Sequence, residues 1–191
     1  MRAARATAWV LTIGGLLGLL GALTLTIERI MLLEDSAYVP SCNLNPVLSC
    51  GSVMTTEQAA LFGFPNPIIG IVAFTVVLMT GILTLGRIEL PHWYWLGLST
   101  GTALGVVFVH WLIYQSLYEI HALCPYCMVV WAVTMPIFIV SLSQLVDRDR
   151  DRAGNITRAL LEWRWTILAV WYAIVIAAIG IEFSDYWSTL V

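Results

Sequence analysis

The chain has 191 residues, of which 60% are hydrophobic and only 11% are charged. Soluble domains carry about 25% charged residues, so this composition indicates a membrane protein. The formal net charge is −3 and the sequence contains no lysine, which excludes a basic surface for nucleic acid. Because most residues are committed to the membrane, no second domain of appreciable size fits into the chain.

Five apolar stretches are long enough to cross a bilayer, which takes about 20 predominantly apolar residues. In chain order they cover residues 8–33, 67–85, 93–117, 122–146 and 165–181. The first stretch is longer than the roughly 7–15 apolar residues of a signal peptide, so we expect an uncleaved membrane anchor. We therefore predict an all-α integral membrane protein with five transmembrane helices.

The arginines predict the orientation of these helices. With a cytoplasmic N-terminus, eight of the nine arginines fall in cytoplasmic segments, and only Arg29 lies near the opposite face. This agrees with the rule that cytoplasmic loops are enriched in Lys and Arg. The prediction is a plasma (inner) membrane protein with a cytoplasmic N-terminus and two extracytoplasmic segments, residues 34–66 and 118–123.

All four cysteines fall on the predicted extracytoplasmic side. Cys42 and Cys50 lie in the long segment 34–66, and Cys124 and Cys127 lie at the start of the fourth stretch. Disulfides persist on the oxidising side of a membrane and are rare in the cytosol. The sequence therefore predicts disulfide chemistry for all four.

The segment "LCPYC" has the features of a redox-active pair. Residues three apart lie on one face of a helix, so the Cys124 and Cys127 sulfurs can approach each other. Pro125 suits a first helical turn, which places Cys124 at a helix N-terminus. The helix dipole and the unpaired N–H groups there favour a thiolate.

Two other interpretations of the cysteines remain open from the residues alone. The cysteines could form purely structural disulfides, or four thiolates could bind zinc. The spacing of eight between Cys42 and Cys50 is poor for a zinc site, and His121 would be a more natural fourth ligand than Cys42. We therefore expect no metal.

Three motifs in chain order, "CNLNPVLSCGSVMTT", "LFGFPNPIIG" and "LCPYC", resemble the vitamin K epoxide reductase (VKOR) family in its bacterial form. The resemblance covers roughly residues 10–146. It implies a four-helix transmembrane bundle around a quinone, with an electron relay in the outer loop and a fifth transmembrane helix outside the bundle. It divides the chain into the segments 1–146 (core, with the redox loop 34–66), 147–164 (cytoplasmic loop) and 165–191 (fifth helix and outer tail).

The resemblance also assigns roles by position. Cys42 and Cys50 match the loop pair of the relay, and the other two cysteines match the active-site pair. Asn66 matches an asparagine that hydrogen-bonds a quinone carbonyl, and Thr56 stands where the family commonly has a serine. Trp131 stands where the vertebrate enzymes carry a quinone-binding tyrosine; an indole N–H donates a hydrogen bond but cannot accept one.

What the family implies is a thiol:quinone oxidoreductase, with a quinone of the menaquinone or ubiquinone type. Many bacterial relatives continue into a thioredoxin-like domain. We expect no fused domain of this kind, and therefore a separate thioredoxin-fold (DsbA-like) partner and a role in disulfide formation in exported proteins. Two alternatives remain: a quinone-epoxide reductase of the vertebrate type, and a membrane scaffold stapled by disulfides.

The sequence also suggests roles for several other residues. We expect Glu28 and Arg29 to form a snorkelling pair at the end of the first helix. His110 is a candidate proton relay or a neutral histidine bonded to a neighbouring helix, and His121 could assist thiolate formation. Residues 55–63 form a short interfacial helix, and the glycines of the first stretch pack closely against another helix.

Overall fold

The computed structural model describes the whole chain except residues 1, 36, 149–153, 155–158, 160 and 189–191. Five of its helices are long and apolar enough to cross a membrane, as predicted. They are α1 (Arg2–Glu34), α3 (Pro67–Leu85), α4 (His92–Tyr114), α5 (Pro125–Arg148) and α7 (Arg164–Glu182). Much of the predicted cytoplasmic loop, including Arg150, Arg152 and Arg158, lies outside the described residues.

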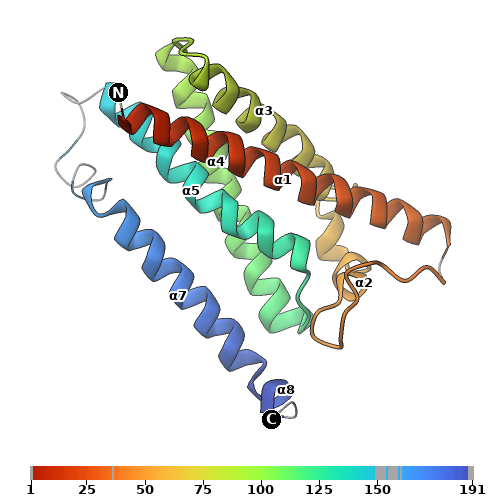
Figure 1. Cartoon of the computed structure of the whole chain (residues 1–191). Helices are drawn as coiled ribbons and strands as arrows, with labels where there is room; N and C mark the ends of the chain where they lie inside the picture. The colour runs from red at the N-terminus through yellow and green to blue at the C-terminus, as the bar shows by residue number, and fades with distance from the viewer. Residues whose placement is uncertain (1, 36, 149–153, 155–158, 160, 189–191) are drawn as a thin grey trace.

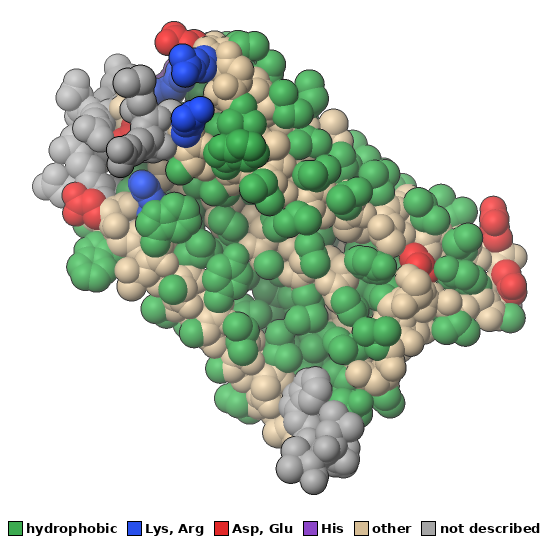
Figure 2. Space-filling model, in the orientation of Figure 1, with side chains coloured by type: hydrophobic (Ala, Val, Ile, Leu, Met, Phe, Trp, Pro, Cys, Tyr) green, Lys and Arg blue, Asp and Glu red, His purple; other side chains and the backbone are tan. Residues whose placement is uncertain are grey.

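Four of the helices, α1, α3, α4 and α5, form a bundle, and α7 lies along one side of it (Figure 1). Helix α1 packs against both α3 and α5, and α4 packs against α5. The bundle buries a core that includes Leu11, Phe74, Trp95 and Ile137. Hydrophobic side chains cover most of the face seen in Figure 2, as expected for a surface in contact with lipid.

Glycines allow a close approach between α1 and α3. A Cβ atom on Gly15 would lie 2.6 Å from the backbone nitrogen of Leu78, and one on Gly81 would lie 2.5 Å from that of Thr12. Real Cβ atoms do not approach backbone this closely, so a larger residue would push the helices apart. The glycines of α1 therefore serve helix packing, as expected.

Helix α7 is joined to the bundle by polar contacts of two aromatic residues. The Trp171 indole N–H donates to Nε2 of His110 over 2.9 Å, while Nδ1 of His110 lies 2.8 Å from the Val106 carbonyl oxygen. Since Nε2 accepts, the proton sits on Nδ1, and His110 is the neutral bridge between helices that the sequence left as one of two options. The Tyr172 hydroxyl donates to the carbonyl oxygen of Ala132 in α5.

The connection between α4 and α5 differs from the predicted one. Helix α4 continues as a π-helical turn, Gln115–Ile120, and His121 then adopts a left-handed conformation with φ +55°. Residues 122–124 are not helical, because the backbone of Leu123 pairs with the redox loop instead. The fourth predicted span therefore begins at Pro125 and not at residue 122.

The redox loop between α1 and α3 contains two short helices, and the sequence indicated only one. Helix α2 (Cys50–Met54) was not predicted; it begins at the second loop cysteine. The predicted interfacial helix at 55–63 is one 3-10 turn, Glu57–Ala60. A third short helix, α8 (Ser184–Ser188), follows α7.

Candidate active site

The loop cysteines are joined in a disulfide at one end of the bundle. Cys42 and Cys50 have Cα atoms 5.6 Å apart, within the range of about 4.4–6.8 Å seen for disulfides. Ser49 caps α2, its hydroxyl accepting from the backbone N–H of Ser52, so the second cysteine is held in the first turn of a helix. The disulfide is buried although it belongs to a loop: Cys42 is 4% exposed and Cys50 is 0% exposed.

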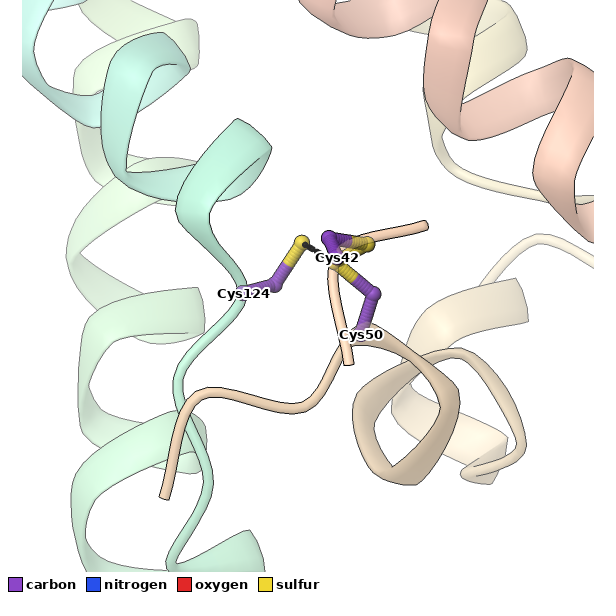
Figure 3. A group of neighbouring side chains, drawn as sticks. All are labelled: Cys42, Cys50 and Cys124. Carbon is purple, nitrogen blue, oxygen red and sulfur yellow. Dashed lines mark hydrogen bonds between the residues drawn. A yellow bond between two sulfur atoms is a disulfide. The ribbon is translucent and has the colours of Figure 1, made fainter. Parts of the chain in front are cut away.

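A short parallel bridge joins this loop to the segment before α5. The Ser49 N–H donates to the carbonyl oxygen of Leu123 over 2.9 Å, and the Leu123 N–H donates to that of Val47 over 2.8 Å. Cys50 follows Ser49 and Cys124 follows Leu123, so the hydrogen bond between Ser49 and Leu123 places the two cysteines beside each other. Their Sγ atoms are 3.0 Å apart, and the Cys124 side chain points at the disulfide (Figure 3).

Cys124 occupies the predicted position immediately before the first turn of α5. The Cys127 side chain hydrogen-bonds to its sulfur and lowers the pKa of Cys124 below its usual value, against the opposing effect of burial. The backbone N–H groups of Tyr126 and Cys127 lower this pKa further. They are among the unpaired donors of a helix N-terminus, which favour an anion. Of the two free cysteines, Cys124 is therefore the one that more readily becomes a thiolate or leaves as one.

A cavity of about 520 Å³ opens between α1, α3, α4 and α5. Most of its lining is apolar, and its polar lining residues include Arg29, Asn66, Cys127 and Trp131. Small-molecule sites typically have volumes of about 300–1,000 Å³, mostly apolar walls and a few polar groups. This cavity therefore fits the ring and part of the tail of a quinone. A line of sulfurs leads from the redox loop to the cavity wall. It starts at the Cys42–Cys50 disulfide, continues to Cys124 and ends at Cys127, which lines the cavity.

Of the three residues expected to contact a quinone, two line the cavity. Trp131 is buried in its wall. Asn66 also lines it, but its side chain braces the loop: Nδ2 donates to the carbonyl oxygen of Gln58 over 2.7 Å, and Oδ1 accepts from the Leu61 N–H over 3.1 Å. The Asn66 amide nitrogen carries two N–H groups, and these bonds use only one of them. Thr56 is outside the described lining, and its hydroxyl donates to the carbonyl oxygen of Val53.

The expectation that Glu28 forms a snorkelling pair with Arg29 is wrong. Glu28 is 6% exposed and accepts hydrogen bonds from the Tyr38 hydroxyl and from both the N–H and the hydroxyl of Ser41. The bond to this carboxylate raises the pKa of Tyr38. The signal in the sequence was an acidic residue within an apolar stretch, but its partners belong to the loop that follows.

His121 contacts helix α7, whereas the sequence suggested that it could assist thiolate formation at Cys124. Its Nε2 lies 3.5 Å from Oε1 of Glu182 at the end of α7, and its side chain is 60% exposed. His121 therefore contributes a contact between the α4–α5 connection and α7.

The causes of the low Cys124 pKa yield a direct test. With the loop disulfide intact, Cys124 is the only free thiol in both Cys127→Ala and Cys127→Ser. We expect a higher Cys124 pKa in Cys127→Ala, because the side-chain donor is lost, and a lower one in Cys127→Ser, because a hydroxyl still donates. The measurement is thiolate absorbance against pH, with Cys124→Ala in each background as the blank. Equal values in the two variants would contradict the assignment.

The similarity of the chain to known proteins agrees with this geometry. The family model described as the vitamin K epoxide reductase family matches residues 9–142. The match covers α3, α4 and the redox loop in full, with most of α1 and α5. The comparison with individual curated proteins gave no match. Since the family model covers well over half of the chain, the protein belongs to the vitamin K epoxide reductase family and is a membrane oxidoreductase.

Proposed function

We propose that the protein is a thiol:quinone oxidoreductase that reoxidises a separate thioredoxin-fold (DsbA-like) disulfide donor outside the cytoplasm. The observation that carries the proposal is the 3.0 Å contact between the Cys50 and Cys124 sulfurs, with Cys127 on the wall of an apolar cavity. A scaffold stapled by disulfides needs no free thiol against its disulfide. An electron relay does, because thiol–disulfide exchange proceeds by direct attack of one sulfur on another.

The partner enters at Cys42. A partner thiolate attacks the Cys42 sulfur, the Cys42–Cys50 bond breaks, and Cys50 leaves as a thiolate. Cys42 is the cysteine attacked because the sulfur released must be the one in contact with Cys124. The second partner thiolate then attacks the mixed disulfide, which gives the oxidised partner and a Cys42 thiolate.

The electrons pass inward through the same sulfur contact. The Cys50 thiolate attacks Cys124 of a Cys124–Cys127 disulfide, and Cys127 leaves as a thiolate. The Cys42 thiolate attacks Cys50, which restores the loop disulfide and releases Cys124. The features that lower the Cys124 pKa stabilise the reduced form of the inner pair, which makes the Cys124–Cys127 disulfide more oxidising. The net result is an oxidised partner and two thiols at the cavity end.

The cavity supports a quinone as the final acceptor. A bound quinone of the menaquinone or ubiquinone type supplies an acceptor for two electrons and two protons. Cys127 is the relay sulfur that lines its site, and Asn66 and Trp131 are the lining residues that would hold it. Thr56 supports the loop beside the cavity through its bond to Val53.

The arginines support a cytoplasmic face at the opposite end of the bundle. Arg87 follows the end of α3, Arg148 ends α5 and Arg164 begins α7. In Figure 2 the visible Lys and Arg side chains gather near the end where Figure 1 places the N-terminus. The positive-inside rule then puts the redox loop outside the cytoplasm, in the plasma (inner) membrane.

Replacing single cysteines tests the order of the relay. With the oxidised partner, Cys50→Ala should accumulate a mixed disulfide, because the free Cys42 thiolate attacks the partner's disulfide and no Cys50 remains to displace it. Cys42→Ala should give none, because the remaining Cys50 is buried. Cys124→Ala and Cys127→Ala should each abolish quinone reduction. The readouts are non-reducing electrophoresis with the purified partner and quinone absorbance. A variant of any one of the four that keeps its turnover would contradict the proposed order.

Filling the cavity tests the acceptor site separately. A Cβ on Gly101 of α4 would meet no atom within 4 Å, and Gly101 lines the cavity. Gly101→Phe should therefore raise the KM for quinone at least about tenfold, since a buried aromatic ring occupies much of the site. Gly180→Phe on α7, where a Cβ also meets no atom within 4 Å, is the matched control and should leave this KM unchanged. Equal effects of the two substitutions on this KM would contradict the assignment of the cavity as the quinone site.

A further inference from the structure

Glu28 is a buried carboxylate of α1 whose bonds all lead to the segment before Cys42. Oε2 accepts from the Tyr38 hydroxyl over 2.9 Å, and the Ser41 N–H lies 3.3 Å from both carboxylate oxygens. The Ser41 hydroxyl donates to Oε1 over 2.5 Å. Hydrogen bonds to an ionised acceptor are about twice as strong as neutral ones, so this segment is held firmly against α1.

These bonds fix the position of Cys42 in particular. Ser41 immediately precedes Cys42, and the Ser41 hydroxyl also lies 3.4 Å from the Tyr126 hydroxyl in the first turn of α5. Cys50, in contrast, is positioned by the bridge between residues 47–49 and Leu123, to which Glu28 contributes nothing in the described contacts. Glu28 therefore supports Cys42 from its N-terminal side. On the C-terminal side, Oδ1 of Asn43 accepts from the Gly51 N–H over 2.9 Å and links Cys42 to the segment of Cys50.

The burial of the disulfide shows what the Glu28 support does. Cys42 is 4% exposed and Cys50 is 0% exposed, and both lie in a buried cluster with Leu25 and Met54. An outside thiol therefore cannot reach either sulfur while Cys42 keeps this position. Thiol–disulfide exchange needs access to the attacked sulfur. A partner can attack Cys42 only after Cys42 leaves this position, and the bonds from Ser41 to Glu28 oppose that movement.

We propose that Glu28 is a positioning residue that holds Cys42 in a closed redox loop, with the disulfide turned towards Cys124 and shielded from outside thiols. The functional part of this inference rests on the proposed function. The closed loop favours exchange between Cys50 and Cys124, and release of Tyr38 and Ser41 from Glu28 gives the partner access to Cys42. The physical claim about the loop stands without a quinone or a partner.

Reduction by dithiothreitol tests the shielding on the full-length protein in detergent. Dithiothreitol gives two electrons to the Cys42–Cys50 disulfide and closes to its own cyclic disulfide, leaving two cysteine thiols. Glu28→Ala should speed this reduction at least about tenfold, because a lost charge-assisted bond shifts the closed–open equilibrium by that order. Glu28→Gln keeps one acceptor oxygen and should fall between. Glu34→Gln, an exposed acid at the end of the same helix, is the control and should not change the rate.

A second readout separates positioning from a general loosening of the fold. In Cys127→Ala, three cysteines remain for one disulfide, and two of the three possible pairings, Cys42–Cys50 and Cys50–Cys124, compete for Cys50. Adding Glu28→Ala should raise the ratio of Cys50–Cys124 to Cys42–Cys50 at least about tenfold, because Cys42 loses its support from α1 while the bridge keeps Cys124 at Cys50. Peptide mass spectrometry under equilibrating thiol conditions measures the ratio.

The outcomes distinguish this inference from the proposed function. If Glu28→Ala leaves the dithiothreitol rate within twofold, or lowers the amounts of both disulfides together, Glu28 does not position Cys42. The relay itself would be unaffected by that result. If instead the rate and the ratio both change as expected but the protein passes no electrons to quinone, the positioning role holds and the quinone-linked function fails.

Discussion

Two backbone hydrogen bonds join the redox loop to the segment before α5, from Ser49 to Leu123 and from Leu123 to Val47. They set the register in which Cys50 and Cys124 follow as neighbours, with sulfurs 3.0 Å apart. Without this pairing, the loop disulfide and the Cys124–Cys127 pair would be two separate groups at one end of a bundle. With it, they form a continuous line of sulfurs that ends on the wall of the cavity.

The rest of the structure holds both sides of that bridge in place. The glycine contacts between α1 and α3 bring together the two helices from which the redox loop starts and to which it returns. The π-helical turn and the left-handed His121 end α4 so that the chain is extended at Leu123 and helical from Pro125. Asn66 fastens the last part of the loop to the start of α3. Each of these features serves the position of a sulfur or of the cavity below it.

The sequence was sufficient to predict the features that depend on local pattern. The five membrane helices follow from apolar stretches alone, and the bounds of the second predicted stretch, 67–85, agree with α3. The location of Cys124 immediately before a helix, with Pro125 in the first turn, follows from the spacing of "LCPYC". The family was recognisable because three motifs occur in a fixed order, and the family model supports it.

Contacts between distant segments could not be predicted in the same way. The pairing of Leu48 with Leu123 joins residues far apart in the sequence, and no repeating pattern predicts it. Because of this pairing, α5 begins at Pro125, three residues after the predicted start at residue 122. Glu28 stood out as a charge in an apolar stretch, but the donors that satisfy it lie 10 and 13 residues further on, in a loop without regular structure. For Asn66, the resemblance indicated a bond to a ligand, and it gave no sign of the two bonds that its side chain makes to the loop.

The exchange between Cys50 and Cys124 can be measured most directly with these two cysteines alone. In the double variant Cys42→Ala, Cys127→Ala, they are the only sulfurs left for a disulfide. Mild oxidation of the folded protein should join them quickly and almost completely, and peptide mass spectrometry should identify the Cys50–Cys124 bond. The matched variant Cys42→Ala, Cys124→Ala should remain reduced under the same conditions. If Cys50 and Cys124 stay free while the fold is intact, the two pairs do not exchange and the relay is excluded.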